Sequence, residues 1–154
     1  MGVYSKKIKD IKDLKDGSTV SIPNDPTNES RALDILANAG LIKLKDNPLK
    51  TPLDIVDNPK KLKFEEIEAA QVPRTLDDVT IAVINTNYAL NANLNPVRDA
   101  LVLESKNSPY VNYVVVKDGN ENSPKIKALD KAINSSEVKK FIEIKYNGAI
   151  LPAF

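Results

Sequence analysis

The sequence predicts an α/β fold, because short β-rich segments alternate along the chain with segments of helical periodicity. Residues 80–84 (TIAVI) form a continuous β-rich run, which is typical of a strand covered on both faces. Residues 30–39 repeat apolar side chains at helical spacing and are followed by Gly40, a common helix stop. The 154 residues are 42% apolar and 28% charged, which is the composition of a globular domain.

The first strand–helix unit spans residues 19–40. Residues 19–22 predict a half-buried strand, Asn24 and Asp25 mark a turn, and Pro26 suits an early helix position because it has no N–H to leave unbonded. Arg31 then lies one or two turns inside the helix. The N-terminus of a helix favours anions, and a guanidinium there can clamp a carboxylate with two hydrogen bonds. The alternative is an arginine on a solvated helix face.

The rest of the chain continues the same alternation. Residues 6–15 predict a short amphipathic turn or helix, and residues 46–61 a proline-rich loop with a brief helix near residues 53–56. Two further helices are expected at residues 124–133 and 136–146. The remaining predicted strands are short β-rich segments: residues 1–5, 41–44, 62–69, 100–104 and 110–117.

Two asparagines are candidates for ligand binding, one directly after a predicted strand and one within another. Asn85 follows the buried strand, and ligands of open α/β sheets bind beyond the carboxyl ends of strands. It could equally be a turn or a helix cap. Asn112 is the polar interruption within residues 110–117 and must find hydrogen-bond partners. It therefore either bonds to nearby backbone or faces a ligand.

Composition excludes several classes of function. The chain has no cysteine and no histidine, so thiolate nucleophiles, Ser-His-Asp triads and zinc cages are absent. Its five glycines do not cluster, which argues against phosphate-binding loops and dinucleotide-binding motifs. A net charge of +1 without a basic stripe argues against nucleic-acid binding. We expect no metal ion and no cofactor.

Two acidic doublets are the remaining candidates for catalysis. Glu65 and Glu66 are neighbours in a predicted strand, where successive side chains point to opposite faces, so they cannot flank one bond. Asp77 and Asp78 begin a predicted turn. Both doublets are interpreted as solvated surface, and the chain is not expected to be an enzyme.

Several segments together resemble the NlpA family, the methionine-binding lipoproteins that supply methionine ABC importers. They occur in the family's order and run nearly from end to end. The matching segments are MGVYS (1–5), IPNDPTNESRAL (22–33), AGLI (39–42), EAAQVPR (68–74), LDDVTIAVINTNY (76–88), SPYVN (108–112) and SEVKKF (136–141).

The resemblance implies a periplasmic-binding-protein-like α/β fold with two lobes that close on a ligand. Residues 9–108, including hinge segments, would form the second lobe. Residues 1–8 and 109–154 would be the returning part of the first lobe, whose N-terminal half is expected to be missing here. The family's ligand-binding residues match Arg31, which would grip the ligand carboxylate, and Asn85 and Asn112, which would contact its amino-acid backbone.

The resemblance also implies partners and a location. The ligand would be methionine, and the protein would deliver it to the membrane subunits of an ABC importer. The full-length protein would be extracytoplasmic and lipid-anchored, although these 154 residues contain no signal sequence or anchor. The aromatic residues that surround the methionine side chain are expected to come largely from the missing portion.

Two alternatives stay open. A dipeptide such as Gly-Met could occupy the same site, because the backbone-gripping residues would be the same. Alternatively, the chain by itself could bind no ligand and self-associate through exposed sheet edge and apolar surface.

Overall fold

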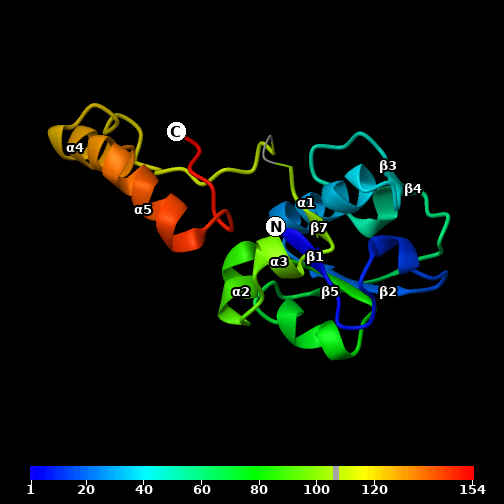
Figure 1. Cartoon of the computed structure of the whole chain (residues 1–154). Coiled ribbons are helices and arrows are strands. Elements are labelled where there is room, and N and C mark those ends of the chain that lie inside the picture. The colour runs from blue at the N-terminus through cyan, green and yellow to red at the C-terminus, as the bar shows by residue number, and fades with distance from the viewer. Residues whose placement is uncertain (106–107) are drawn as a thin grey trace. The chain divides into compact units, whose positions relative to one another are not determined.

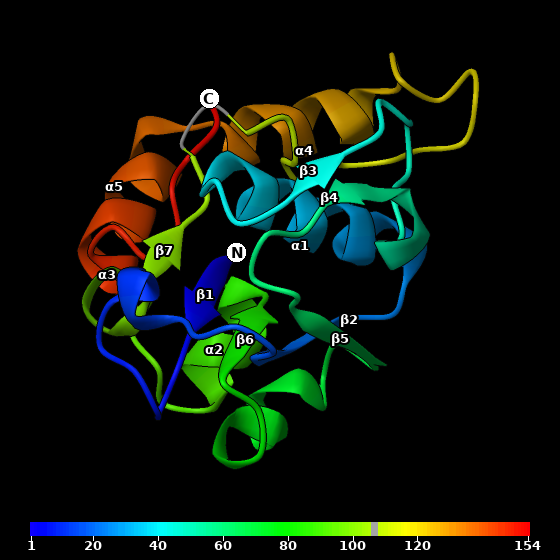
Figure 2. The same cartoon turned by 90° about the vertical axis from the view of Figure 1, so that its right-hand side faces the viewer.

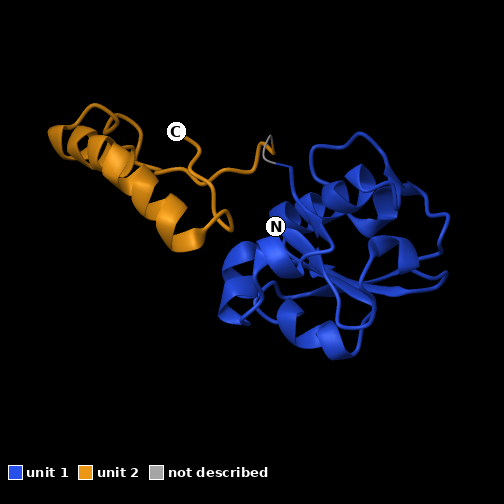
Figure 3. Cartoon of the chain, in the orientation of Figure 1, with its two compact units in different colours: residues 1–105 blue, residues 106–154 orange. Residues whose placement is uncertain are grey.

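The computed structural model describes residues 1–105 and 108–154. The chain divides into two compact units, unit 1 (Met1–Ser105) and unit 2 (Lys106–Phe154), which are drawn in separate colours in Figure 3. None of the helices in the described ranges has the length and apolar character needed to cross a membrane.

Unit 1 is built on a five-stranded sheet with strand order β5-β2-β6-β1-β7. Strand β2 pairs in parallel with β5 and with the central strand β6, whereas β1 pairs antiparallel with both β6 and β7. The carboxyl ends of β2, β6 and β7 therefore lie at one edge of the sheet, together with the start of β1. The strands are β1 (Gly2–Tyr4), β2 (Thr19–Pro23), β5 (Lys63–Ile67), β6 (Ile81–Ile84) and β7 (Val102–Leu103).

Short helices and a second, two-stranded sheet complete unit 1. The second sheet pairs β3 (Lys43–Leu44) with β4 (Ile55–Asp57) in antiparallel fashion. Figure 1 shows the elements in chain order. The α-helices are α1 (Pro26–Asn38), α2 (Thr86–Asn91) and α3 (Pro96–Asp99), and the 3-10 helices are η1 (Ile11–Asp13), η2 (Pro52–Asp54) and η3 (Val72–Asp77).

Helix α1 begins and ends where local signals predict. Asp25 is its N-cap and accepts a hydrogen bond from the backbone N–H of Asn28, while Pro26 opens the first turn. The chain leaves the helix through Gly40, whose φ of +75° lies in the left-handed region that glycine adopts without steric cost. The predicted helix and its stop are confirmed.

Apolar side chains cover both faces of the sheet. In β6, Ile81 and Val83 belong to a cluster with Leu33 of α1, whereas Ala82 and Ile84 belong to a second cluster that includes residues of η3. All four residues of β6 are buried. Figure 2 shows α1 and the green 3-10 turns of η3 on opposite sides of the sheet. The prediction of a strand covered on both faces is confirmed.

The predictions of a short turn or helix in residues 6–15 and of a brief helix near residues 53–56 are confirmed in part. Only Ile11–Asp13 of the first segment forms a 3-10 turn. Near residues 53–56 the structure has η2 followed by β4, because Ile55–Asp57 finds Lys43–Leu44 as a partner. In the second segment, strand β4 forms because it pairs with β3, which lies earlier in the chain.

Unit 2 contains two helices, α4 (Pro124–Ile133) and α5 (Ser136–Tyr146), with the bounds that the sequence predicts. The predicted strand at residues 110–117 is wrong for this structure, since these residues form no ladder with any described residue. A strand needs a partner for its backbone groups. Tyr113 and Val115 are 76% and 87% exposed, so no neighbouring element covers them within the described residues.

The predicted boundaries of the two lobes stay a prediction. Strand β1 (Gly2–Tyr4) pairs within the sheet of unit 1. Along the chain, the boundary between the two compact units falls after residue 105, close to the predicted junction at residues 108–109.

Candidate functional site

Two of the three predicted ligand-binding residues come from neighbouring parts of unit 1. Arg31 lies on α1, which follows β2, and Asn85 directly follows β6. Strands β2 and β6 are adjacent and parallel, so the helices that follow them start at the same edge of the sheet. This edge is the usual ligand-binding position in α/β sheets.

The guanidinium of Arg31 forms a bidentate ion pair with Glu104, which follows β7 at the same edge. Nε donates to Oε1 at 2.8 Å, and Nη2 donates to Oε2 at 2.5 Å. The side chains of Arg31 and Glu104 are only 21% and 11% exposed. Arg31 is therefore half-buried and paired, and does not lie on a solvated helix face.

Glu104 also accepts a hydrogen bond from the α-ammonium of Met1, at 2.8 Å. Burial lowers the pKa of this amine, although the hydrogen bond and the charge of Glu104 act in the opposite direction. One carboxylate thus holds two cations that lie 30 residues apart in the chain. The ion pair ties α1 to the segment that leaves β7.

The side chain of Asn85 takes part in a second group of hydrogen bonds at this edge of the sheet. Asn85 occupies the N-cap position of α2, but its side chain makes no capping hydrogen bond. Instead, Nδ2 of Asn85 donates to Oδ1 of Asn28 at 2.7 Å. Nδ2 of Asn28 in turn donates to both carboxylate oxygens of Asp25, at 3.0 and 3.1 Å. Oδ1 of Asn85 is buried and has no hydrogen-bond partner within the described residues.

Asn112 lies in unit 2, and its side chain is exposed. It belongs to the extended segment that forms no ladder with the described residues. Its part in a shared ligand site stays a prediction.

A buried carboxyl group stands beside this edge as well. Glu29 of α1 is 6% exposed, and the carboxyl group of Glu66 on β5 lies beside it. Burial, followed by the interaction with Glu66 and the charge of Asp25, raises the pKa of Glu29 to about 7. Both Glu65 and Glu66 are exposed on β5, so the interpretation of this doublet as solvated surface is confirmed.

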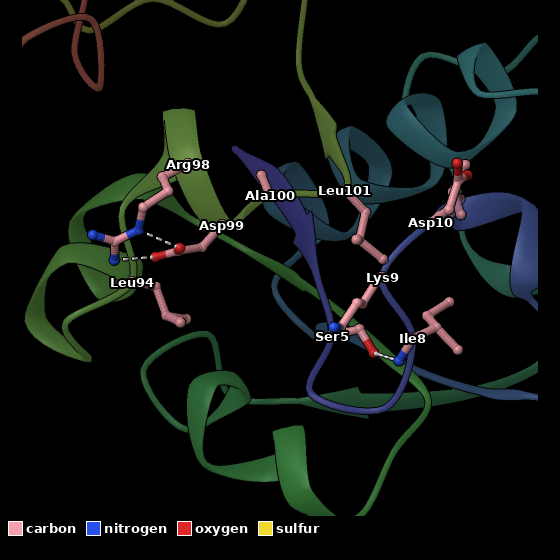
Figure 4. A pocket seen from close by; sticks show the side chains of 10 residues that line it. Ser5, Ile8, Lys9, Asp10, Leu94, Arg98, Asp99, Ala100 and Leu101 are labelled. Atoms are coloured by element: carbon pink, nitrogen blue, oxygen red, sulfur yellow. Dashed lines mark hydrogen bonds and ion pairs between the residues drawn. The ribbon is translucent and has the colours of Figure 1, made fainter.

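A cavity of about 500 Å³ opens elsewhere in unit 1, around the segment after β1 and the α3 region (Figure 4). Arg98 and Asp99 on its wall pair with each other at 2.6 and 2.8 Å. Burial, followed by the charge of Asp99, raises the pKa of nearby Tyr4 to about 12. Neither Arg31 nor Asn85 lines this cavity. Its lining residues are Ser5, Ile8, Lys9, Asp10, Ile11, Leu94, Arg98, Asp99, Ala100 and Leu101.

Three residues of the edge were not singled out from the sequence as site residues: Asp25, Asn28 and Glu104. Asn28 precedes Arg31 by three residues, which places both on one face of the helix, and that spacing could have identified it. Nothing in the sequence points to Glu104, because its partner Arg31 is 73 residues away. Among the described residues, no group of three or more His, Cys, Asp or Glu side chains is arranged to hold a metal ion.

Comparison with known families and proteins gives consistent results. A family model described as NlpA lipoprotein matches residues 1–154. A protein of Salmonella typhi named "D-methionine-binding lipoprotein MetQ" is 50% identical over 149 residues, which cover 94% of this chain and 55% of that protein. The chain thus spans a little over half the length of this relative.

Solved structures resemble the chain over nearly its whole length. One is a nutrient-binding protein from Burkholderia cenocepacia bound to methionine, with a TM-score of 0.94 and 51% identity over 99% of this chain and 66% of that chain. Another is a periplasmic substrate-binding protein of an ABC transporter from Coxiella burnetii, with a TM-score of 0.94 and 48% identity over 99% of this chain and 65% of that one.

Proposed function

Because the chain belongs to the NlpA lipoprotein family, we propose that it is part of a solute-binding protein that delivers methionine, or a closely related amino acid, to an ABC importer. Its fold is a partial periplasmic-binding-protein-like α/β fold. The observation that carries the proposal is the likeness to the methionine-bound Burkholderia protein. At 51% identity the likeness extends to the sequence as well as the fold.

In the proposed complex, Arg31 binds the α-carboxylate of the ligand. Its ion pair with Glu104 uses the edge of the guanidinium formed by Nε and Nη2. Glu104 would thus hold the guanidinium in place at the edge of the sheet where the ligand is proposed to bind. Charge-assisted bonds of this kind gain strength where water is excluded.

The two asparagines bind the α-ammonium through their side-chain carbonyl oxygens. Oδ1 of Asn85 supports this role, because a buried acceptor without a partner is costly and a ligand donor would satisfy it. Asn112 would add a second acceptor when the lobes close. The proposed role is binding, so no residue has to act as a nucleophile or a general acid.

The proposed partners and location follow from the named relatives. A relative described as an ABC transporter's periplasmic substrate-binding protein supports delivery to membrane subunits. Relatives named lipoproteins support an extracytoplasmic protein that is lipid-anchored in its full-length form.

Replacement of Arg31 tests the proposal. In the full-length protein, Arg31→Ala is expected to abolish methionine binding measured by isothermal titration calorimetry, because bonds to charged groups contribute about 1.5–3 kcal/mol each. Arg98→Ala is the matched control, since the side chain of Arg98 is exposed and forms an ion pair with its neighbour Asp99. Retained micromolar affinity in Arg31→Ala would contradict the assignment. Competition with Gly-Met and other amino acids identifies the preferred ligand.

A second candidate is that the 154-residue chain binds no ligand and self-associates. The exposed apolar side chains of unit 2 favour it, with Phe141 at 55% and Ile144 at 71% exposed. A concentration-dependent mass above that of a monomer in light scattering, together with no response to methionine, would support this candidate. A monomeric mass would count against it.

A further inference from the structure

The orientation of the Asn85 amide follows from a chain of hydrogen bonds that begins at a carboxylate. The two ends of an asparagine amide differ in their hydrogen bonding, because the carbonyl oxygen accepts and the NH₂ group donates. An ionised carboxylate can only accept hydrogen bonds. Asp25 contacts the Asn28 amide through both of its oxygens, so the group of Asn28 that faces Asp25 must be the NH₂.

The same reasoning applies to Asn85, the next residue in this series of hydrogen bonds. Once the NH₂ of Asn28 faces Asp25, its carbonyl oxygen faces Asn85. An acceptor in that position requires the NH₂ of Asn85, so the carbonyl oxygen of Asn85 points away from Asn28. That oxygen is the one that is buried without a partner within the described residues.

Asp25 is itself held in place by a separate constraint. Its Oδ1 accepts from the backbone N–H of Asn28, which caps α1. The start of the helix therefore fixes the carboxylate, the carboxylate fixes Asn28, and Asn28 fixes Asn85. These hydrogen bonds connect the carboxyl end of β2 to the carboxyl end of β6.

We propose that Asp25 and Asn28 are positioning residues that make Asn85 present a hydrogen-bond acceptor to the ligand, and that they thereby select ligands with a positively charged amino group. The proposal rests on the proposed function. A free amide could rotate and offer either a donor or an acceptor, and it would then accept an amine or a hydroxyl with little preference. The held amide presents only an acceptor, which favours the charged donor.

The test compares two ligands that differ at this one group, L-methionine and its analogue with a hydroxyl in place of the α-amino group. Asp25→Asn in the full-length protein keeps a good helix cap but adds an NH₂ that can donate to Asn28. The preference for methionine over the hydroxy analogue is expected to fall by roughly tenfold or more, the equivalent of one bond to a charged group. Asp34→Asn, the same change further along α1, is the control, because Asp34 pairs with Lys50.

An exchanged pair provides the rescue. In the double variant Asp25→Asn, Asn28→Asp, the carboxylate stands at residue 28, accepts from Asn85 and keeps its amide in the same orientation. The double variant is therefore expected to recover most of the preference that Asp25→Asn loses, at the same net charge as the wild type. A purely structural role for Asp25 predicts no such recovery.

Side-chain amide NMR of the ligand-free protein gives a second readout. The Asn85 NH₂ signals are expected to exchange slowly with water in the wild type and faster in Asp25→Asn. An unchanged preference between the two ligands in Asp25→Asn would overturn the proposal. Failure of the wild type to bind methionine at all would overturn the proposed function and with it the role in ligand selection, whereas the NMR comparison would still show whether the amide is held.

Discussion

The two units use similar sequence patterns and reach different structures. Both contain β-rich segments and amphipathic helices, but the buried core residues all belong to unit 1, and no described residue of unit 2 is buried. The β-rich run at residues 81–84 lies between β2 and β1 and is fully covered, whereas residues 110–117 form no ladder within the described chain. The difference shows that burial of an apolar segment depends on the elements available to cover it.

Backbone hydrogen exchange should show the largest difference between the units. Amides of β6 are expected to exchange at least about a thousandfold more slowly than those of residues 110–117, because they open only with much of the core. Mass spectrometry of exchange-labelled peptides measures both segments in one sample. Strong protection of residues 110–117 would contradict the expected difference between the two units. Loss of that protection on dilution would identify a second copy of the chain as the cover.

Matched leucine substitutions in the two units should differ by several kcal/mol. Leu33→Ala in α1 removes a fully buried side chain and is expected to lower the free energy of unfolding by about 2–5 kcal/mol. Leu129→Ala in α4 shortens a side chain that is 43% exposed, and a change within about 0.5 kcal/mol is expected. Urea unfolding followed by circular dichroism measures both. Equal losses would mean that unit 2 has a core comparable to that of unit 1.

A smaller effect is expected from the buried carboxyl of unit 1, and it depends on pH. The pKa of Glu29 is raised from 4.5 to about 7 in the folded chain, so folding favours its protonated form. This stabilisation is complete below pH 4.5 and is lost as the pH rises through about 7. Glu29→Gln should therefore flatten the fall in stability across this window, by on the order of 1–3 kcal/mol.

Glu65→Gln is the control for this experiment, because Glu65 is an exposed neighbour of Glu66 on β5. Urea unfolding at several pH values between 4 and 8 gives the profile for each variant. A Glu29→Gln profile that runs parallel to the wild type would show that Glu29 does not take up a proton on folding.

Much of the fold follows from local sequence signals. The start of α1 at Asp25 and Pro26, its stop at Gly40 and the bounds of α4 and α5 all depend on residues close in sequence, and these predictions are confirmed. Strand β6 was predicted correctly because its composition requires cover on both faces. The resemblance of the whole chain to the NlpA family, seen in its sequence segments, is likewise confirmed.

Long-range contacts decided what sequence reasoning missed. The pairing of Arg31 with Glu104 joins residues 73 positions apart, and the bond from Asn85 to Asn28 joins residues 57 positions apart. No local pattern encodes such contacts, since they exist only after strands from different parts of the chain have aligned their carboxyl ends.

The α/β class, the family and two polar residues at the edge of the sheet, Arg31 and Asn85, could therefore be predicted from the amino-acid sequence. The tertiary structure sets the hydrogen-bond partners of these residues and the orientation of the Asn85 amide. It also leaves residues 110–117 without a ladder to any described residue, although their composition favours a strand. Propensity and capping act over a few neighbouring residues, whereas hydrogen-bond partners and burial are set by which distant segments meet.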